Sequence, residues 1–130
     1  MKQNWVFDAS PLIILGKANL LKVISPLASC WFISEGVVQE VSRKSSIEPL
    51  LLQLSEGSKI KRKILKKIEP LVSNWNLGYG ESEAITLAMN NSKCGVILDD
   101  LQARKCAKVF NIPLIGTLGL IVKAKKRRLT

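Results

Sequence analysis

The sequence contains no histidine and only three cysteines. Without an imidazole base, the usual Ser–His and Cys–His nucleophile pairs are excluded. Cys30, Cys94 and Cys106 are odd in number, far apart and without a CxxC spacing, which argues against a disulfide framework and against a zinc site. We predict that they are buried thiols in a reducing compartment. An enzyme with this composition would have to use carboxylate, lysine or metal chemistry.

Long hydrophobic runs are also absent. The longest, residues 11–15 and 118–122, are far shorter than the roughly 18 to 20 residues of a membrane helix. Asp8 interrupts the N-terminal apolar segment and no small-residue cleavage site follows it, unlike in a signal peptide. We therefore predict a cytoplasmic protein without a membrane segment. A length of 130 residues with 47% hydrophobic content indicates one domain over residues 1–130.

Acidic residues are scarce, since the chain has 10 of them against 20 basic residues and a formal net charge of +10. This balance favours a polyanionic partner, either nucleic acid or an acidic protein. Either of two basic clusters could instead be a solvated face, and the second also lies where a helix C-terminus favours cations. The clusters are Lys59, Lys61, Arg62, Lys63, Lys66 and Lys67, and Lys123, Lys125, Lys126, Arg127 and Arg128.

The order of apolar segments is typical of an α/β protein. Short β-favouring runs at residues 5–8, 30–33, 95–98 and 112–115 predict strands, and Pro113 places the last at a sheet edge. Helical patterns follow the strands, and Ser34 is expected to cap the second helix. Because strands and helices alternate, we predict a mostly parallel sheet covered by helices on both faces.

The middle of the chain has a looser pattern. Residues 47–68 are predicted to form two helices, or one helix and an irregular connection, with Pro70 as the stop. Residues 72–80 have the composition of a loop, and a helix is predicted from Glu81.

Aspartates follow two of the predicted strands. Asp8 ends the first strand, and Asp99 and Asp100 follow the run at residues 95–98. The carboxyl ends of parallel strands form the edge at which open sheets bind ligands. The structural alternative is that each aspartate only caps the next helix.

Three glutamates could complete this acidic edge. Glu40 lies about two turns into its predicted helix, while Glu81 and Glu83 begin another and point to different sides of it. Either could face the edge, or both could only complement the helix dipole. Carboxylates crowded at one edge repel each other unless a divalent cation neutralises them, and an all-oxygen site favours Mg²⁺ or Mn²⁺. Arg104 could pair with the acids, bind a phosphate, or be an ordinary surface residue.

Five motifs resemble, in this order and spacing, those of the PIN-domain family and its VapC-like toxin subfamily. They are DASPLI at 8–13, VQEV at 38–41, GESEAI at 80–85, LDD at 98–100 with Ala103 and Arg104, and GTLG at 116–119. The resemblance covers nearly the whole chain. It implies a three-layer α/β/α sandwich and Mg²⁺- or Mn²⁺-dependent cleavage of RNA.

The resemblance also implies roles for individual residues and partners. The catalytic and metal-binding residues would be Asp8, Glu40, Glu83 and Asp100. The supporting residues would be Ser10, Glu81, Asp99, Arg104 and Thr117. The doubled acids leave open Glu81 or Glu83 as the third ligand, and Asp99 or Asp100 as the fourth. Toxins of this type pair with a cognate antitoxin and form homodimers, so both partners are implied.

We therefore expect a metal-dependent endoribonuclease that is the toxin of a toxin–antitoxin pair. A catalytically inactive PIN-like module that binds nucleic acid or protein is the alternative, and the presence of acids at all four positions speaks against it. A phosphatase using Asp8 as nucleophile ranks last, because no glycine-rich phosphate loop follows the first strand.

Overall fold

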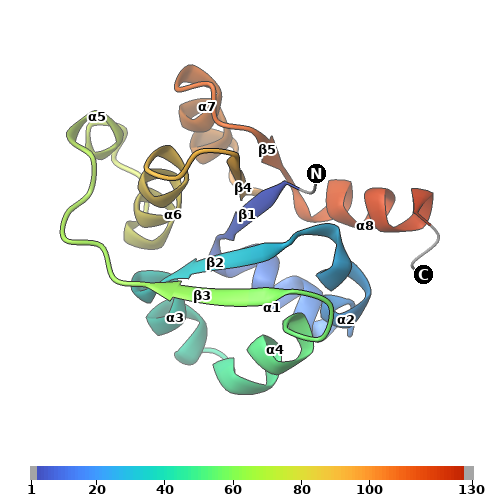
Figure 1. Ribbon diagram of the computed structural model, residues 1–130. Helices are drawn as coiled ribbons and strands as arrows, with labels where there is room; N and C mark the ends of the chain where they lie inside the picture. The colour runs from blue at the N-terminus through green and yellow to red at the C-terminus, as the bar shows by residue number, and fades with distance from the viewer. Residues whose placement is uncertain (1–2, 128–130) are drawn as a thin grey trace.

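A five-stranded parallel sheet forms the centre of the molecule (Figure 1). The computed structural model describes residues 3–127. The strand order is β3-β2-β1-β4-β5 and every pairing is parallel. The strands are β1 (Asn4–Phe7), β2 (Cys30–Ser34), β3 (Lys59–Lys63), β4 (Cys94–Ile97) and β5 (Leu114–Ile115). Four of them confirm the strands predicted from the sequence, and β5 lies at a sheet edge as expected.

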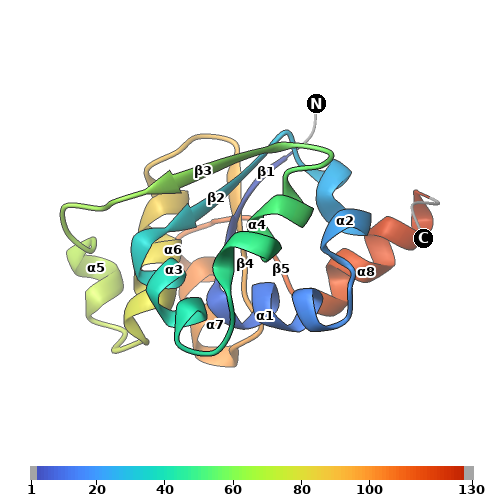
Figure 2. The same ribbon diagram turned by 90° about the horizontal axis from the view of Figure 1, so that it is seen from below.

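Helices cover both faces of the sheet and give it two separate cores (Figures 1 and 2). One face packs against α1 (Ala9–Lys17), α2 (Leu21–Ile24), a 3₁₀ turn (Ser25–Leu27), α3 (Glu35–Ser42), α4 (Ile47–Leu54) and α8 (Thr117–Lys126). The other packs against α5 (Pro70–Ser73), α6 (Tyr79–Met89) and α7 (Leu101–Val109). The predicted three-layer α/β/α sandwich is confirmed.

The central strands are hydrophobic because both of their faces are covered. Val6 and Phe7 of β1 are fully buried, and they belong to opposite cores, as alternation along a strand requires. The Phe7 and Trp31 rings pack with centroids 5.1 Å apart, and the Trp31 indole N–H donates to the Ser25 carbonyl at 3.0 Å. These contacts fix the position of β1, whose carboxyl end carries Asp8.

The segment from residue 47 to residue 68 differs from its prediction. Only Ile47–Leu54 is helical, and Lys59–Lys63 is an edge strand paired with β2. The local pattern could not reveal β3, because Ile60 is its only apolar residue and its stability comes from hydrogen bonds to β2. Pro70 begins α5 instead of ending a helix, which is the position where its missing N–H costs least.

Within residues 3–127, no single helix is long and apolar enough to cross a membrane. The segments Ala9–Lys17 and Leu21–Leu27 pass a test of length and composition together, but they are bent by 116° at their break. Their apolar side chains Leu12, Leu15 and Leu21 are fully buried in the core.

Candidate metal centre

The acidic residues gather where the winding of the sheet reverses. The chain runs outward from β1 through β2 to β3, then returns to place β4 on the other side of β1. Ligands of open parallel sheets bind at such a switch point, beyond the carboxyl ends of the two strands. Asp8 follows β1, and Asp99 and Asp100 follow β4. The sheet therefore brings these residues to one edge, as predicted.

Asp8 is a buried carboxylate with an unpaired oxygen. Its exposed fraction is 4%, and its Oδ1 atom has no hydrogen-bond partner among residues 3–127. Burial is the main cause that raises the pKa of Asp8 to about 7; the Ala9 backbone N–H lowers it, and the charges of Glu81, Glu40 and Asp99 raise it further. An unpaired acceptor this deeply buried is costly unless a ligand satisfies it.

Glu40 meets Asp8 over a glycine of α6. A Cβ atom added to Gly80 would lie 2.9 Å from Glu40 Oε1 and 3.9 Å from Asp8 Oδ1. Glu40 reaches this point from α3. Ser34 caps that helix, because the Ser34 hydroxyl accepts a hydrogen bond from the Val37 N–H at 3.2 Å. The absence of a side chain at Gly80 leaves room for both carboxylates.

Glu81 belongs to the electrostatic environment of Asp8. Its Oε1 accepts a hydrogen bond from the Gly78 N–H at 3.2 Å, so its side chain satisfies a backbone donor at the start of α6. Burial raises the pKa of Glu81, and the charges of Asp100 and Glu40 raise it further.

Glu83 has a different partner. It is 3% exposed, and its Oε1 accepts a hydrogen bond from the Gly36 N–H at 2.7 Å, in the first turn of α3. Its charge and a hydrogen bond from the phenol raise the pKa of Tyr79. The charge of Glu81 thus acts on Asp8, whereas Glu83 joins α3 to α6. Which of the two binds a metal stays a prediction.

The two aspartates after β4 also have separate partners. Asp99 accepts hydrogen bonds from the Thr117 N–H at 2.8 Å and from the Thr117 hydroxyl at 2.5 Å. Asp100 caps α7, because its Oδ2 accepts a hydrogen bond from the Ala103 N–H at 3.0 Å. Both carboxylate oxygens of Asp99 therefore accept hydrogen bonds from Thr117 of α8, whereas the cap of α7 occupies only one oxygen of Asp100.

Two predicted supporting residues lie at the margins of the site. Arg104 donates to the Leu98 carbonyl at 2.9 Å, and a Cβ on Gly116 would lie 3.0 Å from Arg104 Nη1 and 2.9 Å from Asp99 Oδ1. Arg104 is therefore close to Asp99 at the base of the acidic edge. Ser10 is exposed and makes no side-chain hydrogen bond with another described residue.

Comparison with known proteins identifies the family. The model of the PIN-domain family matches residues 4–130. The chain belongs to the PIN-domain family. No curated protein matches it significantly.

Two solved structures share the fold of this PIN domain. One is a PilT N-terminus domain protein from the hyperthermophilic archaeon Sulfolobus solfataricus P2, with 22% identity, a TM-score of 0.69, and 93% of this chain and 92% of that chain covered. The other is PAE2754 from Pyrobaculum aerophilum, with 14% identity, a TM-score of 0.60, and coverage of 97% and 99%. At these identities, the likeness establishes the fold alone.

The carboxylates of the PIN domain are close together but do not by themselves form a complete metal-binding site. Among residues 3–127, no group of three or more acidic or cysteine residues has the geometry of a metal site. The unpaired Asp8 Oδ1, with Glu40 beside it over Gly80, nevertheless fits a hard divalent cation, which takes oxygen ligands. The residues present therefore suit Mg²⁺ or Mn²⁺, the ions predicted from the sequence.

The remaining sequence features take no part in this centre. Cys30, Cys94 and Cys106 are buried free thiols, as predicted, and burial raises the pKa of each, that of Cys94 to about 12. Such thiols are neutral and unreactive. In the second basic cluster, Lys123 lies 5.7 Å from the centroid of the Trp5 ring, and Arg128 lies outside the described residues.

Three features of the site were not predicted from the sequence. Gly36 and Gly80 each admit the carboxylate of a glutamate from the facing helix, and Tyr79 contacts both Gly36 and Glu83. Gly80 did carry a signal, because glycine in the first turn of a helix is unfavourable unless something must approach closely. The partner that approaches Gly80 is visible only in three dimensions.

Proposed function

We propose that this PIN domain is a Mg²⁺- or Mn²⁺-dependent endoribonuclease. PIN domains are generally nucleases, and the observation that carries the proposal here is the buried, unpaired Asp8 carboxylate facing Glu40 across Gly80. The net charge of +10 suits a polyanionic substrate. We further propose that the protein is a cytoplasmic VapC-like toxin that forms a homodimer and is restrained by a cognate antitoxin.

We propose Asp8, Glu40, Glu81 and Asp100 as the metal ligands. Glu81 replaces Glu83 in this set, because Glu81 acts on the charge of Asp8 whereas the Glu83 carboxylate binds the Gly36 N–H. Asp100 is preferred to Asp99, because only one of its oxygens is used by a cap. When bound, the metal lowers the pKa of a coordinated water and neutralises charge that develops on the phosphodiester.

The residues of the chain have supporting tasks in this mechanism. Asp8 must be ionised to bind the cation, so its proton leaves as the metal enters. Asp99 holds the first turn of α8 through Thr117 and thereby fixes that helix beside the end of β4. Arg104 stands beside Asp99, where it can bind a phosphate of the substrate or balance the acidic cluster.

The proposal is tested by assaying RNA cleavage with Mg²⁺ or Mn²⁺, with EDTA, and in the variant Asp8→Asn. We expect cleavage by the wild type, none in EDTA, and a loss of at least about 100-fold in the variant. Cleavage that Asp8→Asn leaves intact would contradict the assignment. RNA binding that is sensitive to salt but indifferent to metal and to Asp8, with no cleavage, would identify the inactive binding module instead.

The toxin role and the dimer need separate measurements. Induced expression of the wild type should arrest growth, expression of Asp8→Asn should not, and co-expression of a protein encoded beside it should restore growth. Sedimentation equilibrium should give twice the monomer mass of 14.4 kDa. Growth arrest by Asp8→Asn would exclude catalysis as the cause of toxicity.

A further inference from the structure

The edge strand β3 carries a row of lysines on one face. Lys59, Lys61 and Lys63 alternate with Ile60 and Arg62, so the three lysines project to the same side at intervals of about 7 Å. That side is the one covered by α5–α7, because the Lys61 ammonium lies 5.7 Å from the centroid of the Phe32 ring, which belongs to the core of that layer. Lys66 and Lys67 extend the row. We call these five lysines the lysine surface.

The charge of the lysine surface is not neutralised within the described part of the chain. On the opposite face of β3, Arg62 pairs with Glu35 at 3.0 Å and with Glu48 at 3.5 Å. None of the five lysines has a carboxylate within ion-pair distance among residues 3–127. They are also exposed, so they are available to a polyanion.

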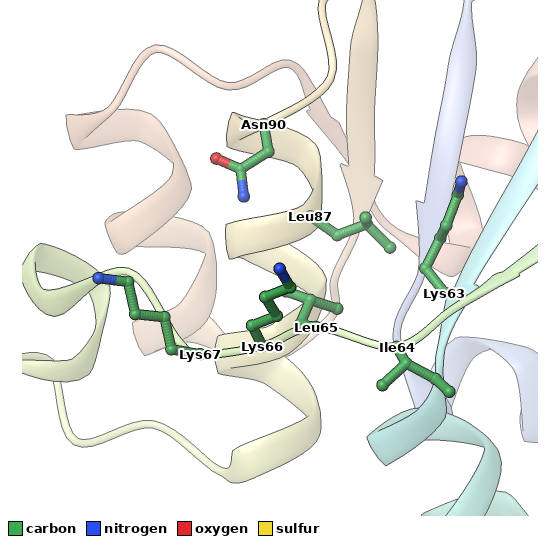
Figure 3. A pocket seen from close by; sticks show the side chains of 7 residues that line it. All are labelled: Lys63, Ile64, Leu65, Lys66, Lys67, Leu87 and Asn90. Atoms are coloured by element: carbon green, nitrogen blue, oxygen red, sulfur yellow. The ribbon is translucent and has the colours of Figure 1, made fainter.

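A pocket of about 320 Å³ lies at one end of the lysine surface. It is lined by Lys63, Ile64, Leu65, Lys66, Lys67, Leu87 and Asn90. Figure 3 shows Lys63 and Lys67 on either side of Leu65 and Lys66, with Leu87 of α6 and the amide of Asn90, which follows α6, across from them. Apolar walls for a base, an amide for its polar edge and ammonium groups for a phosphate are what a nucleotide requires.

A chain of contacts links the lysine surface to the carboxylates. Lys63 is in register with Ser34, which caps α3. In the first turn of α3, a Cβ on Gly36 would lie 3.0 Å from Cδ2 of Tyr79. Gly80, the residue after Tyr79, lies against Glu40 and Asp8. Tyr79 thus adjoins the carboxylates through Gly80 and the start of α3 through Gly36, and its 65% exposed ring can stack against a base.

We propose that the lysine surface and Tyr79 bind single-stranded RNA where it extends beyond the phosphate that is cleaved. The proposal rests on the nuclease function and names the part of the protein that holds the substrate. RNA fits better than an acidic protein, because the lysines line a pocket of nucleotide size and an exposed aromatic ring lies beside the carboxylates. Unstacked bases of a single strand can use all three features.

RNA binding can be measured without cleavage, by the fluorescence anisotropy of a labelled single-stranded RNA in EDTA. The test variant is Lys61→Gln/Lys63→Gln/Lys66→Gln. Its matched control is Lys44→Gln/Lys125→Gln/Lys126→Gln, which removes the same charge from exposed positions elsewhere. We expect Kd to rise at least about tenfold in the test variant, and the slope of log affinity against log salt to flatten by about 2. The control should stay within about threefold of the wild type.

Tyr79 is tested in the same assay by two substitutions. Tyr79→Ala should raise Kd by about 5- to 100-fold, while Tyr79→Phe, which keeps the ring, should bind nearly as the wild type does. Equal losses in Tyr79→Ala and Tyr79→Phe would overturn stacking. Circular dichroism and thermal unfolding of each variant should match the wild type, because the replaced side chains are exposed.

The outcomes separate this proposal from the nuclease function. If the wild type cleaves RNA while the lysine variant binds it as well as its control does, the lysine surface is overturned and the nuclease stands. If the wild type binds RNA through these lysines but never cleaves it with metal, the surface stands and the nuclease fails.

Discussion

At the residue scale, Asp8 is a charged group that folding alone would disfavour. Its carboxylate is buried, lacks a partner on Oδ1 and lies among other acids, which together raise its pKa to about 7. A residue that is costly to the fold in this way is typical of a binding or catalytic site. The free-energy cost of burying Asp8 makes the stability of the protein depend on pH.

Without metal, Asp8 should make the protein less stable as pH rises. Its folded pKa of about 7 exceeds the ordinary value of 3.8, so between these pH values the folded state holds a proton that the unfolded state has lost. Stability from this residue is complete below pH 4 and falls until about pH 7, by roughly 1 to 4 kcal/mol. Urea unfolding in EDTA at several pH values should therefore show that the free energy of unfolding of Asp8→Asn rises relative to that of the wild type from pH 4 to pH 8. A constant difference would mean that Asp8 is not perturbed.

Glu81 and Glu83 allow a matched comparison within one helix. Glu81→Gln keeps an acceptor for the Gly78 N–H, and Glu83→Gln keeps an acceptor for the Gly36 N–H. We expect Glu81→Gln to lose cleavage by about 100-fold or more, and Glu83→Gln to stay within about tenfold of the wild type. Both should unfold at nearly the wild-type temperature. Loss of cleavage only in Glu83→Gln would restore Glu83 as the third ligand.

At the scale of elements, α3 and α6 pack through a reciprocal exchange. Gly36 of α3 receives the Glu83 carboxylate from α6, and Gly80 of α6 receives the Glu40 carboxylate from α3. The contact of Glu83 with Gly36 fixes the helices against each other, and the contact of Glu40 with Gly80 places a proposed ligand beside Asp8. The pairing therefore couples helix packing to the geometry of the site.

Gly80→Ala should separate activity from stability. The new Cβ would lie 2.9 Å from Glu40 Oε1, so the flexible end of Glu40 must move away from Asp8. Alanine favours the helix by up to about 1 kcal/mol, which leaves stability unchanged or higher. We expect cleavage to fall about tenfold or more. Mn²⁺ should also raise the melting temperature less than it does in the wild type, because the metal binds more weakly. Gly16→Ala, whose Cβ would press on the flexible end of Leu50, is the control and should retain both.

At the scale of the whole molecule, the sheet divides the protein into two cores, and all three cysteines lie in the one beneath α5–α7. Their thiols report on the integrity of that layer. The acidic edge draws residues from both sides of the sheet, through Glu40 on α3 and Glu81 on α6. The site therefore exists only when both layers are packed.

The thiols should become reactive only on unfolding. Each is buried with its pKa raised, so Ellman's reagent should label the native protein at least about 10³-fold more slowly than the unfolded chain. In guanidinium chloride, three thiols per chain should react, along the same transition that fluorescence reports. One thiol that reacts rapidly in the native state would show that the α5–α7 layer opens by itself.

Most of the sheet follows from local sequence patterns. The runs that form β1, β2 and β4 are apolar because central parallel strands are covered on both faces, and Pro113 marks β5 as an edge strand. Ser34 marks the start of α3 by its capping chemistry. The strand β3 could not be recognised in this way. Its lysines remain exposed, and pairing with the backbone of β2, which no side-chain pattern encodes, is what makes it a strand.

The sequence by itself determined that carboxylates, not histidine or thiols, must carry any metal chemistry, and that Asp8 and Asp99–Asp100 follow strands of a parallel sheet. Residue type and strand periodicity are local properties, so they can be read along the chain. Tertiary structure decided which acids share one electrostatic environment. Glu81 and Glu83 are two residues apart and chemically identical, yet the Gly36 N–H of α3 binds Glu83, whereas Glu81 interacts with the charges of Asp8 and Glu40. This difference is set by how two helices pack.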